Sequence, residues 1–165
     1  MGTIIKAEDS RRIFVSTLNE LAKTDPNIIV IICDVGFNYL DDPSNKFKVI
    51  NLGVTEASAT IIAAALALSG FSVWIYTMIP FVLFRPYEMV RNAIVKHSAN
   101  VKLIGVKGSE KYKFLGFSHN LSYEEEDIDA CKNIGLRYHV PKSLDGIKGL
   151  IIKLHNEKEP SYIRL

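Results

Sequence analysis

The apolar run from Ile28 to Cys33 constrains the fold of this chain more than any other segment. It consists of isoleucine, valine and one cysteine, with no strongly polar side chain to face solvent. An uninterrupted run of this kind predicts a strand that is covered on both faces, as in a parallel sheet with helices above and below it. Further short strands are predicted at Lys48–Asn51, Ser72–Tyr76, Val101–Val106, Arg137–Val140 and Tyr162–Arg164.

Segments with a helical pattern separate these strands. Helices are predicted at Asp9–Lys23, from a Thr55 cap to Leu68, at Tyr87–Lys96, from the capping-box pair Ser122 and Glu125 to Lys132, and at Leu144–His155. The segments 35–45 and 108–120 are predicted loops. Strands that alternate with helices indicate right-handed crossovers and a parallel sheet. We therefore predict one α/β domain over residues 1–165, a three-layer sandwich with a mostly parallel sheet. Ligands of such a sheet bind beyond the carboxyl ends of its strands.

The composition excludes several classes of protein. Lys and Arg number 20 against 18 Asp and Glu, a net charge of +2, so nucleic acid is not a predicted partner. The N-terminus does not resemble a signal peptide, which favours a cytoplasmic location. Cys33 and Cys131 are predicted to be buried thiols. The sequence carries no cysteine and histidine spacing typical of a metal site and no glycine-rich phosphate-binding motif.

The segment from Ala57 to Phe84 contains no charged residue. Because Ser69-Gly70 and Pro80 interrupt it, we predict a helix, a turn, a strand and a loop there, and no membrane span. The chain is 48% hydrophobic and only 23% charged, which is apolar for a soluble monomer. We therefore expect a partner interface on this segment, with Ala63, Ala64, Ala65 and Ala67 allowing close approach.

Four segments resemble segments of transketolases, in the same order along the chain. Asn27–Gly36 resembles a first strand that ends in Asp-Leu-Gly, and Asn51–Ser58 resembles the segment Asn-x-Gly-Ile-x-Glu. Tyr76–Asn92 resembles the run Thr-Phe-x-x-Phe followed by Arg-Ala-Tyr-Asp-x-Ile-Arg, and Gly116–Asn120 resembles Gly-Pro-Thr-His-Gln. The resemblance covers Asp9 to Leu165. It implies the pyrimidine-binding domain of transketolase-like thiamine diphosphate enzymes, with the thiamine diphosphate-binding fold.

The resemblance also implies a partner. In this family a second domain binds Mg²⁺ and the diphosphate through a Gly-Asp-Gly motif, and that motif and the family's third domain are absent from this sequence. We therefore expect one subunit of a split enzyme, paired with a separate diphosphate-binding chain, with two such pairs forming a heterotetramer. The implied reaction transfers a two-carbon ketol unit between sugars or sugar phosphates. A related synthase or decarboxylase subunit and a non-catalytic α/β scaffold subunit are the alternatives.

The resemblance assigns the cofactor contacts to five residues. Glu56 would activate the cofactor through a hydrogen bond to a ring nitrogen of its aminopyrimidine, for which burial favours the protonated carboxyl and the helix N-terminus opposes it. Phe81 would stack on the aminopyrimidine, and Met78, Val54 and Asp34 would lie beside the cofactor. The alternatives are an ordinary acidic first-turn residue for Glu56, core packing for the apolar side chains, and a turn cap for Asp34.

Three residues are assigned to the substrate by the same resemblance. Arg11 would bind a sugar phosphate, and His119 would contact substrate oxygens and move protons, as a catalytic residue. Lys107 stands where the family has a substrate-binding histidine. A further departure is the segment Lys113–Gly116, where the family has Gly-Glu-Asp-Gly. The alternative for Arg11 and His119 is a solvated surface position.

Overall fold

A computed structural model describes residues 7–107 and 110–165, and of residues 7–9 and 110–113 it describes the backbone alone. Its strands are β1 (Ile28–Ile32), β2 (Lys48–Asn51), β3 (Ser72–Met78), β4 (Val101–Val106), β5 (Arg137–His139) and β6 (Ser161–Arg164). They form one six-stranded sheet in the order β2-β1-β3-β4-β6-β5, and every pairing is parallel. The predicted α/β class is therefore confirmed, with a sheet that is wholly parallel.

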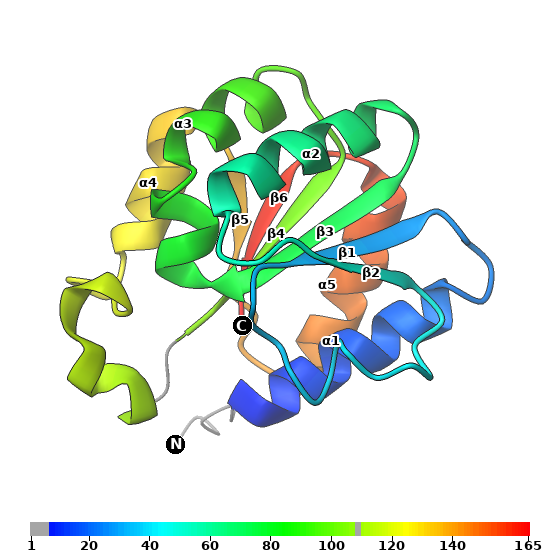
Figure 1. The fold of residues 1–165 in the computed structure, drawn as a ribbon, viewed down its shortest axis with the longest axis horizontal. Helices are drawn as coiled ribbons and strands as arrows, with labels where there is room; N and C mark the ends of the chain where they lie inside the picture. Colours follow the sequence, from blue (N-terminus) through cyan, green and yellow to red (C-terminus); the bar gives the residue numbers. More distant parts are fainter. Residues whose placement is uncertain (1–6, 108–109) are drawn as a thin grey trace.

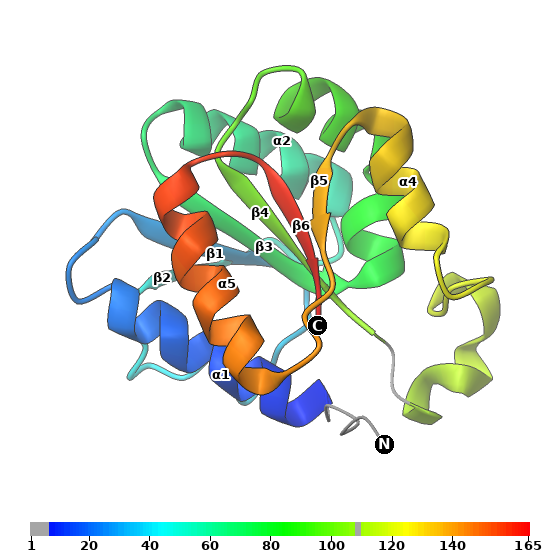
Figure 2. The same ribbon diagram turned by 180° about the vertical axis from the view of Figure 1, so that it is seen from behind.

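Helices cover both faces of the sheet, which gives three layers (Figures 1 and 2). α1 (Ala7–Leu21) and α5 (Leu144–Glu157) pack together on one face. The other face carries α2 (Glu56–Leu68), α3 (Tyr87–Met89) and α4 (Glu126–Ile134), together with the π-helical turns η1 (Pro80–Phe84) and η2 (Val90–Val95). The 3₁₀ segment η3 (Glu110–Ser118) lies beside the body of the domain, between β4 and α4.

The alternation of side chains along β1 explains its apolar composition. Ile28, Val30 and Ile32 enter the core under α1 and α5, whereas Ile29, Ile31 and Cys33 enter the core under α2. All of these side chains are buried. A strand in the middle of a parallel sheet has no solvent face, so both sets of alternating positions must be apolar.

Several local predictions differ from the structure. The predicted loop before Arg85 is the π-helical turn η1, and part of the predicted loop 108–120 is the 3₁₀ segment η3, while residues 108 and 109 lie outside the described part of the chain. The capping box is wrong, because α4 begins at Glu126 and the backbone N–H of Ser122 donates to Glu126 Oε2 at 2.6 Å. Thr55 precedes α2 without a capping bond, because its hydroxyl donates to Leu52 O.

The charge-free segment 57–84 folds as α2, β3 and η1. In the described ranges, no helix has the length and apolar character needed to cross a bilayer. Two of the alanines expected at a partner interface are wrongly assigned, because Ala63 and Ala64 face the sheet of this chain and are buried. Small side chains there let α2 approach β3 closely. The exposed large side chains of α2 are Ile61, Ile62 and Leu68.

A buried ion pair joins α4 to β6 close to the carboxyl edge of the sheet. Asp127 has no exposed surface, and it accepts hydrogen bonds from Tyr162 Oη at 2.6 Å and Arg164 Nε at 2.9 Å. Arg164 also donates to the backbone carbonyl of Glu124 at 2.8 Å. Burial and the adjacent Asp127 carboxylate hold the pKa of the Tyr162 hydroxyl well above its ordinary value. The network fixes the segment that leads from η3 into α4.

Candidate functional site

Glu56 is placed at the carboxyl edge of the sheet by the turn between β2 and α2. Asn51, at the end of β2, organises that turn: its Oδ1 accepts from the backbone N–H of Asp34 at 3.1 Å and of Gly53 at 3.0 Å. Its Nδ2 donates to Asp34 Oδ1 at 2.9 Å. Gly53 adopts a φ of 68°, a left-handed conformation that glycine enters without strain. Glu56 then opens α2 with only 4% of its surface exposed.

Arg85 is the charged partner of Glu56. Its Nη1 donates to Glu56 Oε1 at 2.8 Å, and its own side chain is 42% exposed. The bond reaches across from the end of η1, where the backbone N–H of Arg85 donates to Pro80 O. The Oε1 atom of Glu56, the residue expected to bond to the cofactor, is therefore occupied by a hydrogen bond within this chain.

Phe81 lies between Arg85 and His119. The guanidinium carbon of Arg85 is 3.8 Å from the centroid of the Phe81 ring, which is a cation–π contact. The imidazole of His119 meets the same ring edge-on, with centroids 4.8 Å apart and an interplanar angle of 80°. His119 Nδ1 is also 2.8 Å from Ser118 Oγ. Arg85 and the Phe81 ring therefore link the segments around Glu56, Phe81 and His119 into one cluster of side chains.

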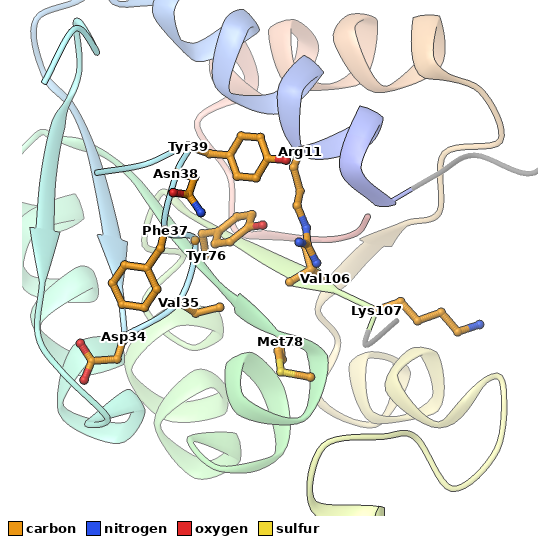
Figure 3. Close-up of a pocket in the computed structure, with 11 residues that line it drawn as sticks. Arg11, Asp34, Val35, Phe37, Asn38, Tyr39, Tyr76, Met78, Val106 and Lys107 are labelled. Carbon is orange, nitrogen blue, oxygen red and sulfur yellow. The ribbon is translucent and has the colours of Figure 1, made fainter. Parts of the chain in front are cut away.

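A cavity of about 390 Å³ lies at the carboxyl ends of β1, β3 and β4, and Asp34 is among the residues that line it (Figure 3). Arg11 reaches into it from α1, and its Nε is buried without a hydrogen-bond partner in the described part of the chain. The remaining walls come from the strand ends and the segment after β1, and they include Asp34, Tyr39, Tyr76 and Met78. A cavity with an unsatisfied guanidinium N–H is suited to an anionic or hydroxyl-rich ligand.

Lys107 borders the same cavity but points away from it (Figure 3). Its ammonium bonds to both carboxylate oxygens of Glu124, at 2.9 and 2.7 Å. This hydrogen bond and the lysine charge lower the pKa of Glu124. Both side chains are more than half exposed, so the pair is a weak surface ion pair. A role for Lys107 in binding therefore requires this ion pair to open.

The other predicted cofactor residues have different surroundings. Met78 is 7% exposed and both packs in the core and lines the cavity. Val54 is 63% exposed, so the alternative that it packs inside the domain is wrong. Asp34 has a φ of 51° and pairs with Asn51 at the strand ends. The burial predicted for Cys33 is confirmed, and desolvation together with the Glu56 charge raises its pKa to about 11.

Two residues of the site had no role assigned from the sequence. Arg85 and Asn51 both lie in the transketolase-like segments, but their partners are distant in sequence. Arg85 follows Phe81 by four positions, a spacing that places two helical side chains on one face, and this was the available signal. Within the described ranges, no group of three metal-binding side chains is close enough together to hold an ion.

Comparisons with known proteins agree with the fold and with the resemblance to transketolases. The family described as "Transketolase, pyrimidine binding domain" matches residues 6–165. An apulose-4-phosphate transketolase subunit of Phocaeicola vulgatus is 30% identical over 159 residues, which cover 94% of this chain and 50% of the relative. The "Putative transketolase C-terminal section" of Methanocaldococcus jannaschii is 27% identical, with 94% and 49% covered. The chain thus spans about half the length of these curated relatives.

Solved structures share the same fold. The structure titled "Split gene transketolase, inactive beta4 tetramer" superimposes with a TM-score of 0.78 at 23% identity, covering 94% of this chain and 50% of that chain. A transketolase from Campylobacter jejuni gives a TM-score of 0.72 at 20% identity, covering 94% of this chain and 25% of that chain. The site segments, the family match over residues 6–165 and the fold agree, and the chain belongs to the transketolase pyrimidine-binding domain family.

Proposed function

We propose that this chain is the pyrimidine-binding subunit of a thiamine diphosphate-dependent enzyme that transfers a two-carbon ketol unit between sugars. The observation that carries the proposal is that the carboxyl group of Glu56, a side chain that is 4% exposed, and the aromatic ring of Phe81 are held together by one residue at the carboxyl edge of the sheet. One residue, Arg85, contacts both. A buried acid next to a flat aromatic face fits a planar heterocycle with a ring nitrogen.

Each side chain of the site has a distinct task in this proposal. Thiamine diphosphate, when bound, supplies the nucleophilic carbon for the two-carbon transfer. Glu56 holds a proton against the ring nitrogen of the aminopyrimidine, and Phe81 packs on the ring face. Met78, Val54 and Asp34 border the cofactor. A polar medium would weaken the hydrogen bond of Glu56, so the burial of this residue supports the role.

The substrate half of the site is assigned to the adjacent cavity. Arg11 binds an anionic or hydroxyl group of the sugar with its unsatisfied Nε–H. His119 meets the Phe81 ring edge-on and is not one of the residues that line this cavity; we assign it to orient a substrate oxygen on the cofactor side of the site and to exchange a proton with it. Lys107 joins them once its ion pair with Glu124 opens. Because a relative is named for apulose-4-phosphate, phosphorylated sugars are the first substrates to test.

The proposed partner is a separate cytoplasmic chain that binds the diphosphate and Mg²⁺. Support comes from the relative named as one subunit of a transketolase and from the neighbour titled as a split-gene transketolase. The exposed apolar side chains Ile61, Ile62 and Leu68 on α2 offer a surface for such a partner, and Val54 extends it toward Glu56. Two pairs of chains would form a heterotetramer.

The test is turnover of the two-subunit enzyme with the Glu56→Gln variant. Glutamine keeps the size of the side chain but cannot exchange a proton, so we expect turnover to fall by about 100-fold or more. Glu88→Gln is the matched control, because Glu88 is an exposed acid that pairs with Asn92 near the same site. Undiminished turnover in Glu56→Gln would refute the catalytic role. A complex that binds no thiamine diphosphate would favour a scaffold subunit.

A further inference from the structure

One side chain covers both groups that the proposed aminopyrimidine site requires. Arg85 donates from Nη1 to Glu56 Oε1 at 2.8 Å, and its guanidinium carbon lies 3.8 Å from the centroid of the Phe81 ring. The Phe81 ring also contacts the His119 ring, in an edge-to-face arrangement. A planar ligand therefore cannot lie against this face of Phe81 and bond to this oxygen of Glu56 while Arg85 holds them.

We infer that Arg85 is a place-holder for the aminopyrimidine, an inference that rests on the proposed function. A guanidinium group and an aminopyrimidine share the relevant chemistry, since both are flat, carry N–H donors in their plane and pack on aromatic faces. Without ligand, Arg85 satisfies the buried carboxylate and covers the aromatic ring. The ligand then replaces the guanidinium in both contacts, the hydrogen bond to Glu56 and the packing on the Phe81 ring.

The exchange also frees the bonding atom of Glu56. With Arg85 in place, Oε1 of Glu56, a side chain that is 4% exposed, accepts from the guanidinium at 2.8 Å. When the guanidinium leaves, this oxygen loses its partner and becomes available to a hydrogen-bonding atom of the ligand. A single movement of Arg85 thus opens the site and frees Glu56 for its proposed role.

Arg85 is suited to such a movement. Its side chain is 42% exposed, whereas Glu56 is 4% exposed, so the arginine can leave toward solvent while the acid stays fixed. It follows the π-helical turn η1, a type of turn that often accompanies functional sites. Glu56, in contrast, is held in the first turn of α2, which packs on β3. The mobile member of the pair is therefore the arginine.

The test uses the full chain in solution, with 4-amino-2-methylpyrimidine as the probe. The side-chain Nε–H signal of Arg85 is assigned in ¹H–¹⁵N spectra as the signal that is lost in Arg85→Ala. While Arg85 lies above the Phe81 ring, the ring current shifts this signal upfield. Addition of the probe should move this signal back to its solvent-exposed position. Arg85→Ala should bind the probe about tenfold more tightly than the wild type, which corresponds to about 1.4 kcal/mol. Arg91→Ala, a second exposed arginine nearby, should bind like the wild type.

The possible outcomes separate this inference from the proposed function. In one outcome, Phe81→Ala and Glu56→Gln lose probe binding, but the probe leaves the Arg85 signal unmoved and Arg85→Ala binds no more tightly than the wild type. This outcome would overturn the place-holder role of Arg85 and leave the pyrimidine site intact. Absence of probe binding even in Arg85→Ala would overturn the pyrimidine site itself and the inference with it. If Arg85→Ala does not fold, Arg85→Gln replaces it, and the displacement of the wild-type signal still decides.

Discussion

Replacement of Asp127 by asparagine tests the buried network that holds the site's surroundings in place. Asp127 is fully buried and accepts from Tyr162 Oη and from two nitrogens of Arg164, which is itself 8% exposed. An asparagine at this position would keep the volume but lose the charge, and its amide N–H₂ would face the donors of Arg164. Removing one partner of a buried ion pair costs about 3–5 kcal/mol.

The structure places the expected cost near the lower end of that range. Arg164 keeps two bonds without Asp127, to Glu124 Oε1 at 3.1 Å and to Glu124 O at 2.8 Å, so its charge is not left without partners. We therefore expect Asp127→Asn to lower the free energy of unfolding by about 3 kcal/mol. With a urea slope of about 2 kcal/mol per molar, the midpoint would fall by about 1.5 M.

Urea unfolding followed by circular dichroism gives the measurement, and α4 itself offers the control. Asp129→Asn breaks an exposed ion pair with Lys132 on the same helix and should leave the midpoint close to that of the wild type. In the Asp127→Asn background, Arg164→Met should recover part of the loss, because it removes a largely buried cation that has lost its buried counter-charge. Equal midpoints for Asp127→Asn and Asp129→Asn would show that the buried ion pair does not stabilise the fold.

Three further predictions follow from other parts of the structure. In Gly105→Ala the new Cβ would lie 2.6 Å from Tyr162 Oη, so we expect the free energy of unfolding, measured in urea, to fall by about 1–3 kcal/mol. In the control Gly149→Ala, on α5, the new Cβ meets no atom within 4 Å, and the free energy of unfolding should rise by up to about 1 kcal/mol. Burial lowers the pKa of Lys102 to about 8 from 10.5, and the unfolded chain therefore binds more protons between these values. We therefore expect the difference in unfolding free energy between the wild type and Lys102→Met to change by roughly 3 kcal/mol in favour of the wild type from pH 8 to pH 10.5. A difference that does not change with pH would contradict the lowered pKa of Lys102. Ile61→Asp on α2 should abolish co-purification with the proposed diphosphate-binding chain, while Ile152→Asp on α5 should not. Retention of the complex in both variants would place the interface elsewhere.

Much of the fold follows from short-range patterns in the sequence. The run Ile28–Cys33 could only be a strand buried on both faces, because each alternate position is apolar. The segment ending in Glu56 was placed correctly at the start of a helix, and Gly53 marks the turn before it. The π-helical geometry of η1 and η2 was not predictable in this way, because the residues there have no periodicity that separates a π-helix from an α-helix.

In the candidate site, too, some features could be predicted from the sequence, whereas others are decided only by tertiary packing. The resemblance to transketolase segments assigned roles to Glu56, Phe81 and His119, and local patterns placed Glu56 at the start of a helix and Phe81 after a strand, because strand ends and helix starts are local features. The folded structure was needed to show that Arg85 reaches Glu56 across 29 positions and lies on Phe81. It was also needed to bring Arg11 and the strand ends into one cavity and to turn Lys107 toward Glu124. These pairings depend on the packing of separate elements against one another, and no local pattern encodes that packing.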